Sequence, residues 1–345
     1  AADQYESMLR RANVIANFDA RRALIVTAVK QAADRDNAHV VTPVEWTKDD
    51  KAAARTILQA NEELLDEVTA IVEWPVVYRG SFDPEFLSVP ARALGLSMQK
   101  NQKYFALVDR AGRLLPAFLV VANLDSKKPK QVVHGNERVL RARLADARFF
   151  YEQDKKIRLD ERLPRLAQVL YQQKLGSQLE RVQRMEKLAG KIASSLKADR
   201  AHAERAAQLS KADLLTDMVG EFPELQGIMG RYYAKYDHEP SVVADAVEQH
   251  YWPRTAGGEL PKQSIAICVA LADKLDTLVG IYGIGLVPTG EKDPFGLRRA
   301  ALGVVRLLVE KSLPLSVADL LALAHSQFPN GVIADDVAQD LHAFM

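Results

Sequence analysis

The chain has 345 residues, of which 46 are Lys or Arg and 45 are Asp or Glu, giving a net charge of +1. Hydrophobic residues make up 48%, which is typical of a folded globular protein, and the length predicts two domains. No apolar run approaches the ~18 residues needed to cross a bilayer, and the N-terminus lacks a signal-peptide pattern. The single cysteine, Cys268, excludes an internal disulfide and fits a reducing cytosol, so we expect a cytoplasmic protein.

The two ends of the sequence indicate a piece of a longer protein. The chain begins with Ala1 rather than Met, and it runs at once into a helical pattern. It stops at Met345 without a capping residue. We therefore expect an excised fragment.

Positive charge is concentrated in the middle of the chain. Residues 127–205 contain 20 Lys plus Arg and 10 Asp plus Glu, a local charge of +10, so the remainder carries −9. Such a segment favours a polyanionic partner. A solvated helical surface with charges of both signs is the alternative.

The first 130 residues predict an α+β part. Helical patterns cover residues 3–36 and 48–70, and β-branched residues then favour extended structure towards Pro75. Residues 80–84 form a predicted turn and residues 91–100 a short helix. Residues 104–108 and 114–123 are predicted strands of a β-hairpin, with its turn at 109–112.

A basic helix joins the two halves of the chain. His134, Gly135 and Asn136 predict a turn with a helix cap, and a helix follows over 136–156. Its apolar positions recur at steps of four, three and four, which places them on one face: Leu140, Leu144, Ala147 and Tyr151. A neighbouring stripe carries arginines, and we expect Arg138 and Arg141, next to the buried face, to pair within the protein.

Residues 160–345 predict an almost entirely helical part. The expected helices are 163–196 (with a break near Gly176), 201–218, 241–250, 265–279, 294–311 and a less regular tail over 316–345. Asp293 and Pro294 favour the start of the helix over 294–311, as its N-cap and first-turn residues. The glycines of 280–285 match no phosphate-binding fingerprint, so we expect them to allow tight helix crossings.

Several long motifs occur in order along almost the whole chain. They are EWP at 73–75, GSFD at 80–83, QKYF at 102–105, ERVLRARLADA at 137–147, EFPELQGIMG at 221–230, LADKLDTL at 271–278 and PTGEKDPFGLRR at 288–299. In these motifs the chain resembles the β subunit of the bacterial tetrameric glycyl-tRNA synthetase.

This resemblance implies a function that composition does not reveal. A complete subunit of this family is about twice as long, so the chain would be a central part that lacks a C-terminal anticodon-binding domain. It implies tRNA(Gly) and the glycyl-tRNA synthetase α subunit as partners in an α2β2 assembly. Glycine activation with ATP and Mg²⁺ would belong to the α subunit, so this chain would hold no cofactor and no catalytic residue.

The helical half also resembles an HD domain, whose active members hold a metal with His and Asp residues. Here the His-Asp doublet position reads Ser210-Lys211, the earlier His position falls near Arg181, and the later aspartate is Asp273. One carboxylate cannot hold a catalytic divalent ion, so the resemblance implies a degenerate site without metal. Lys211 would then place a positive charge suited to phosphate.

The nine cations expected to contact tRNA lie mainly in the basic segment. They are Arg138, Arg141, Arg143, Arg148, Lys155, Lys156, Arg181, Arg184 and Lys211. Pairing within the protein is the alternative for each, and for Arg138 and Arg141 it is the favoured one. We expect Asp273 and Asp276, spaced i and i+3, to pair with Arg298 or Arg299 or to cap backbone. His250 shows no metal-ligand spacing to other histidines.

The predicted fold class is α+β, with a mixed α/β N-terminal part followed by a mostly α-helical HD-like domain. The expected divisions are a body at 1–133, a connecting helix at 134–160, an HD-like domain at 161–314 and a helical linker at 315–345. The expected function is the tRNA-binding β subunit of a glycine–tRNA ligase. A metal-dependent HD-type phosphohydrolase and a purely structural assembly module are the alternatives.

Overall fold

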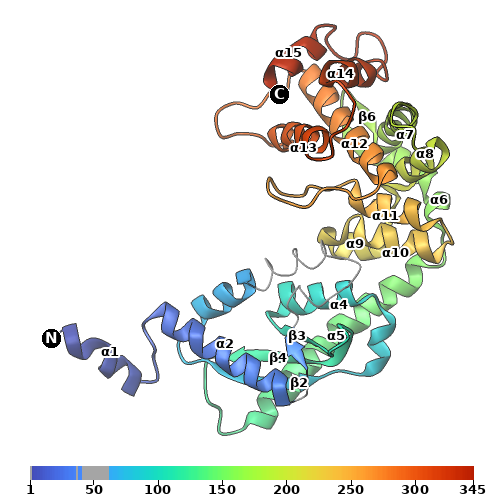
Figure 1. Ribbon diagram of the computed structural model, residues 1–345. Coiled ribbons are helices and arrows are strands. Elements are labelled where there is room, and N and C mark those ends of the chain that lie inside the picture. The colour runs from blue at the N-terminus through green and yellow to red at the C-terminus, as the bar shows by residue number, and fades with distance from the viewer. Residues whose placement is uncertain (1, 36–37, 41–61) are drawn as a thin grey trace. The chain divides into compact units, whose positions relative to one another are not determined.

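A computed structural model describes residues 2–35, 38–40 and 62–345 (Figure 1). The chain forms two compact units, Ala1–Tyr151 and Glu152–Met345. Their boundary lies in the last turn of helix α5 (Pro129–Asp154), within the helix that was expected to connect two domains. The finer divisions remain predictions. The α+β fold class is confirmed.

The first unit is built on a four-stranded antiparallel sheet with strand order β1-β3-β4-β2. Its strands are β1 (His39–Val40), β2 (Val76–Ser81), β3 (Phe105–Val108) and β4 (Leu114–Ala122). Its other elements are α1 (Ala2–Arg11), α2 (Phe18–Arg35), a helix over 62–71, η1 (Pro84–Ser88), α4 (Ala91–Leu96) and η2 (Ser97–Asn101). The predicted hairpin, β3 with β4, is confirmed.

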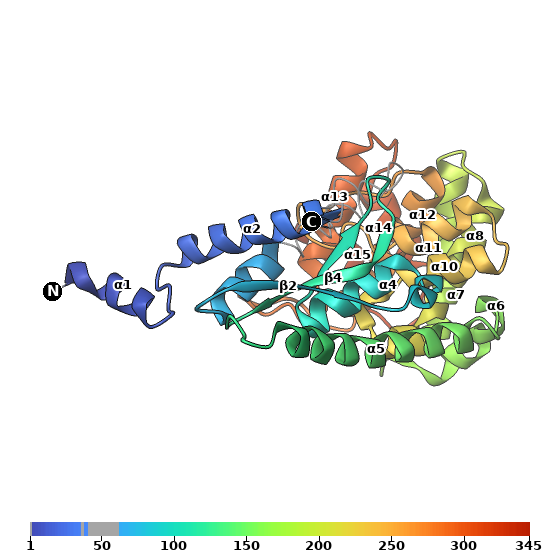
Figure 2. The same cartoon turned by 90° about the horizontal axis from the view of Figure 1, so that it is seen from below.

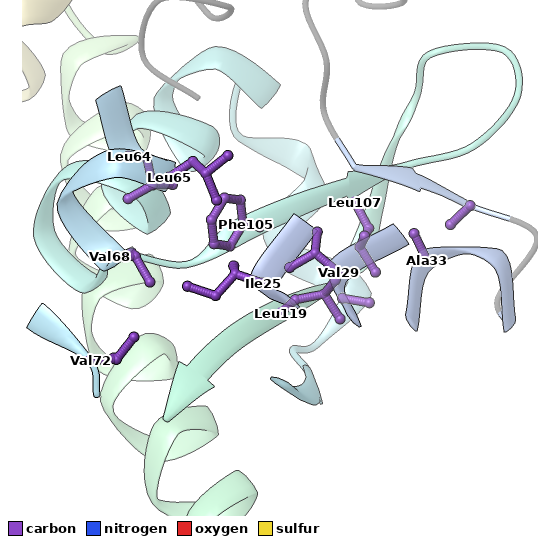
Figure 3. Close-up of a cluster of buried hydrophobic side chains, with 12 residues drawn as sticks. Ile25, Val29, Ala33, Leu64, Leu65, Val68, Val72, Phe105, Leu107 and Leu119 are labelled. Atoms are coloured by element: carbon purple, nitrogen blue, oxygen red, sulfur yellow. The ribbon is translucent and has the colours of Figure 1, made fainter. Parts of the chain in front are cut away.

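Two helices cover one face of this sheet. Ile25 and Val29 of α2, four residues apart, meet Leu64 and Val68, also four apart, over the sheet (Figure 3). Alternate residues of the strands complete this core; they are Phe105 and Leu107 of β3 and Ala117 and Leu119 of β4. The period of two in the strands and of four in the helices therefore determines which residues are buried.

The other face of the sheet is joined to α5. Tyr104 stacks on Phe118 with ring centroids 4.6 Å apart, and its hydroxyl donates a hydrogen bond to Asn136 on α5 at 2.6 Å. The Ser81 amide donates to the carboxylate of Glu137 on α5 at 2.8 Å. These bonds hold α5 against the sheet, and Leu140 on the same helix is fully buried.

Several local predictions in the first unit were wrong. Residues 134–136 are not a turn, because α5 begins at Pro129 and continues through them; the Asn136 side chain bonds the Val132 carbonyl inside the helix. Residues 80–81 belong to β2 rather than to a turn. The helix over 62–71 continues through β-branched residues that were predicted to favour extended structure. The predicted helix over 48–61 lies outside the described residues.

The second unit is helical except for a two-stranded ribbon. Its elements are α6 (Leu159–Arg162), η3 (Leu163–Gln168), β5 (Leu170–Gln172), β6 (Gly176–Ser177), α7 (Gln178–Ser195), α8 (Arg200–Leu209), η4 (Ala212–Leu215), α9 (Asp217–Glu221), η5 (Pro223–Leu225), α10 (Ile228–Tyr236), α11 (Ser241–Gln249), α12 (Ser264–Gly283), α13 (Leu297–Glu310), α14 (Val317–His325) and α15 (Val337–Phe344). The ribbon β5–β6 replaces the first part of the predicted helix 163–196.

Helix α12 is the centre of this unit. It is buried along most of its length because it contacts α7, α8, α11, α13, α14 and α15 (Figure 1). It continues to Gly283, four residues beyond the predicted end, and close neighbours occupy the space beside its last two glycines. A Cβ at Gly280 would lie 3.0 Å from both Leu175 and Phe328, and one at Gly283 would lie 2.8 Å from Ile333. Both glycines are therefore closely packed, but their nearest neighbours lie in segments between the helices rather than at the predicted helix crossings.

Helix α13 begins three residues later than predicted. Asp293 does cap it, since its carboxylate accepts hydrogen bonds from the amides of Leu297 and Arg298 at 2.8 and 2.9 Å. Gly296, in the left-handed conformation with φ 67°, stands between the cap and the helix.

Candidate functional site

The first candidate site is an exposed basic stripe on α5. Lys130, His134, Arg138 and Arg141 follow one another at steps of four, four and three, so they lie along one side of the helix. All four are exposed. Within the described ranges, their side chains have no hydrogen bond or ion pair. The stripe therefore presents four donor groups along about three helical turns.

The expectation that Arg138 and Arg141 pair within the protein was wrong for the described residues. One candidate acid, Glu137, instead accepts hydrogen bonds from both the amide and the hydroxyl of Ser81. The other, Asp146, is exposed. These two arginines are thus the members of the predicted set whose guanidinium groups remain available to a partner.

The remaining predicted cations of α5, and of the turn that follows it, are engaged to different degrees. Arg148 forms an ion pair with Glu85 on η1. Lys155 pairs with Glu152 at 2.7 Å, and Lys156 donates to the Gln153 side chain at 2.9 Å. Arg143 is exposed.

The second candidate site is a buried cluster of ion pairs on α12. Asp273 Oδ1 lies 3.0 Å from Arg181 Nη2, on α7, and 3.0 Å from Lys211 Nζ, which follows α8. One turn further along α12, Asp276 accepts a hydrogen bond from Arg184 Nε at 2.6 Å. The three positions singled out by the HD resemblance, 181, 211 and 273, are therefore brought together by the fold.

These contacts place Arg181, Arg184 and Lys211 in the interior. Their side chains are 11%, 9% and 3% exposed, and each guanidinium or ammonium group has a carboxylate partner. Their geometry favours a structural role over contact with RNA. The expected pairing of the two aspartates with Arg298 or Arg299 was wrong, because Arg181, Arg184 and Lys211 take that position instead.

His250 completes the cluster, and the sequence pattern missed it. Its Nδ1 lies 2.7 Å from the Val247 carbonyl oxygen, so Nδ1 carries the proton and Nε2 accepts from Lys211 Nζ at 2.8 Å. Burial, reinforced by the Lys211 charge, holds the pKa of His250 well below its ordinary value. His250 is 39 residues from Lys211 along the chain, so no local signal connects the two.

Charge compensation sets the other protonation states. Burial alone would raise the pKa of Asp273, but the charges of Lys211 and Arg181 outweigh it and keep that pKa below its ordinary value. Burial lowers the pKa of Lys211 to about 8 against the opposing attraction of Asp273. Burial raises the pKa of Asp213 to about 6. The amides of Gly227 and Gly230 donate hydrogen bonds to its Oδ2 and limit this rise.

This arrangement differs from a metal centre. A cation, Lys211, forms an ion pair with the aspartate that the HD resemblance implies as a ligand. Among the described residues, no group of three or more His, Cys, Asp or Glu could hold a metal ion. A pocket of about 370 Å³ lies beside the cluster, with Tyr251, Arg254, Lys274 and Arg299 among its lining residues.

Comparison with known proteins gives the class of this chain. A family model described as "Glycyl-tRNA synthetase beta subunit" matches residues 1–345, so the match covers the whole chain. The class is therefore that of aminoacyl-tRNA synthetase subunits. The chain belongs to the glycyl-tRNA synthetase beta subunit family.

Curated relatives named glycine–tRNA ligase beta subunit agree with this assignment. The chain is 52% identical to that of Neisseria gonorrhoeae over 345 residues, covering 100% of the chain and 47% of the relative. It is 54% identical to that of Aromatoleum aromaticum over 351 residues, with 100% and 47% covered. It is 57% identical to that of Ralstonia nicotianae over 293 residues, with 85% and 42% covered. The chain spans about half the length of the relatives it matches.

None of the described helices is both long and apolar enough to span a membrane.

Proposed function

We propose that this chain is the tRNA-binding part of the β subunit of a glycine–tRNA ligase. In that role it supports the ATP-dependent attachment of glycine to tRNA(Gly) by an α subunit. ATP and Mg²⁺ would act at the α subunit, and an α2β2 assembly would bring the two together in the cytoplasm. Family membership and the names of the relatives support this proposal.

The observation that carries the RNA contact is the exposed stripe on α5. Guanidinium groups match phosphate oxygens through paired hydrogen bonds, and they bind most strongly where no internal carboxylate competes for them. Arg138 and Arg141 meet that condition, and Lys130 and His134 extend the stripe. The buried cations of the second unit do not meet it, so we assign the RNA contact to α5.

The test is the salt dependence of tRNA(Gly) binding by the whole chain, followed by fluorescence anisotropy. Each phosphate contact contributes about 0.7–0.9 to the slope of log affinity against log salt. If Arg138 and Arg141 each contact one phosphate, the double change Arg138→Gln and Arg141→Gln lowers that slope by about 1.4–1.8.

A matched control removes the same charge elsewhere. Arg10 and Arg11 on α1 are exposed, and their replacement by Gln removes two positive charges without touching α5. The control is expected to retain the wild-type slope. An equal loss in the two double variants would show that tRNA responds to net charge rather than to the stripe. Absence of any gel shift at low salt would favour a structural assembly module.

A further inference from the structure

The pocket beside the buried cluster has the size of a small-molecule site. Its volume is about 370 Å³, within the range of about 300–1,000 Å³ in which ligand pockets fall. The chain segment that follows α11, the middle of α12 and the start of α13 form its walls. All of these elements belong to the second unit.

The charges that line this pocket do not balance. Arg254, Lys274 and Arg299 line it, and Asp273 is the acidic lining residue. Asp273 is already paired with Arg181 and Lys211, each at 3.0 Å. Its negative charge is therefore committed to cations behind the pocket wall, which leaves the pocket itself with an excess of positive charge.

Lys274 contributes a buried ammonium group, and no carboxylate of the described residues forms an ion pair with it. Its Nζ donates to the backbone oxygen of His250 at 3.1 Å, whereas an ammonium group has three donors. Its side chain is held in place by α13, since a Cβ at Gly303 would lie 2.8 Å from Lys274 Cε. Burial lowers the pKa of Lys274 to about 8, so it is still mostly charged at neutral pH.

Arg299 supplies a guanidinium group at the rim. It is exposed, and no described residue forms a hydrogen bond or an ion pair with its side chain. Its Nη2 lies against the turn before α13, 3.0 Å from the position that a Cβ on Gly296 would take. The group is thus folded towards the pocket and retains its fork of donors for an anion.

Two aromatic rings complete the lining. Tyr251 is a fixed wall, because Lys211 Nζ lies 4.0 Å and the Arg254 guanidinium 5.3 Å from its ring centroid. Phe295 is 42% exposed and belongs to the turn before α13. An exposed ring beside cationic donors favours a ligand that combines a planar ring with an anionic group.

We propose that this pocket binds a small phosphate monoester that carries a planar ring, of the size and chemistry of a nucleoside monophosphate. Arg299 and Lys274 hold the phosphate, and Phe295 stacks on the ring. This binding is separate from the RNA contact proposed for α5 and uses different residues. It involves no covalent step.

The test is isothermal titration calorimetry of the whole chain with three probes. Adenosine 5′-monophosphate has both ring and phosphate, ribose 5-phosphate lacks the ring, and adenosine lacks the phosphate. We expect saturable binding of adenosine 5′-monophosphate and affinities for the other two that are weaker by about tenfold, since each loses one set of contacts.

Variants at exposed positions test the assignment without disturbing the core. Arg299→Gln is expected to weaken the binding of adenosine 5′-monophosphate by about tenfold, because it removes a charged donor pair. Arg298→Gln, at the adjacent exposed position outside the pocket, is expected to leave it unchanged. Phe295→Leu is expected to abolish the preference for adenosine 5′-monophosphate over ribose 5-phosphate.

Three results would overturn the proposal. The first is no saturable binding of adenosine 5′-monophosphate in the millimolar range. The second is equal affinity in the Arg298 and Arg299 variants. The third is a loss of tRNA(Gly) binding in Arg299→Gln without mononucleotide binding by the wild type, which would make this surface part of an RNA interface.

Discussion

Asp273 is the residue whose replacement should disturb the second unit most. Its Oδ1 is shared by Arg181 and Lys211, each at 3.0 Å, and its side chain is 13% exposed. Asp273→Asn keeps the shape of the side chain and removes the charge. Breaking a buried ion pair by removing one partner costs about 3–5 kcal/mol, because the other charge remains buried without compensation.

Lys211 and Arg181 should contribute unequally to the loss of stability in Asp273→Asn. Lys211 can lose its proton, and its pKa of about 8 lies about one unit above neutral pH. The most that Lys211 can add at pH 7 is therefore about 1 kcal/mol, the free energy of one pKa unit. Arg181 cannot lose its proton, and the carboxylate that it keeps is Asp276, at 3.6 Å from its Nε. Most of the cost should therefore come from Arg181.

Differential scanning calorimetry and hydrogen exchange in α12 would measure the effect. A unit the size of residues 152–345 shifts its Tm by about 2–4 °C per kcal/mol, so a loss of about 6–20 °C is expected. Glu310→Gln is the control, since the Glu310 carboxylate is exposed and its ion pair with Arg306 lies within one helix. This change should leave the transition of this unit nearly unchanged.

Second-site changes give the sharpest test. In the Asp273→Asn background, Arg181→Met should recover more stability than Lys211→Met, because the guanidinium is the charge that cannot be neutralised. A Tm shift of Asp273→Asn no larger than that of the control would refute the reasoning. So would a larger recovery from Lys211→Met.

Two further predictions concern pH and backbone space. Burial lowers the pKa of Lys274 from 10.5 to about 8, so between these pH values the unfolded chain binds more protons than the folded chain, and the free energy of unfolding should rise with pH. Urea unfolding at a series of pH values should show a weaker rise in Lys274→Met than in the wild type. Identical pH profiles for the two proteins would contradict this prediction. A Cβ at Gly80 would lie 2.4 Å from Phe118 Cζ, so Gly80→Ala should destabilise the first unit by about 1–3 kcal/mol. A Cβ at Gly135 in α5 would have nothing within 4 Å, so Gly135→Ala should instead stabilise the first unit by about 0.5–1 kcal/mol. Thermal unfolding that shows a change in Tm of the same sign for both variants would refute this contrast.

Local sequence signals predicted the parts of the fold that depend on near neighbours. The β3–β4 hairpin was predictable because Asp109 accepts hydrogen bonds from the amides of Ala111 and Arg113, all within five residues. The apolar spacing of α12 and the cap provided by Asp293 were visible for the same reason. The start of α5 was missed because Gly135 and Asn136, usual in turns, are held in the helix by contacts such as that with Tyr104, 32 residues away.

The charged groups show what only the tertiary structure decides. The sequence by itself determined the family, the two-part fold and the positive charge of residues 127–205. It did not determine which of those charges face solvent, because Arg184 and its partner Asp276 are 92 residues apart. Burial and long-range pairing therefore turned the predicted RNA contacts of α7 into core ion pairs. Arg138 and Arg141 of α5, for which pairing within the protein was expected, are instead exposed to solvent.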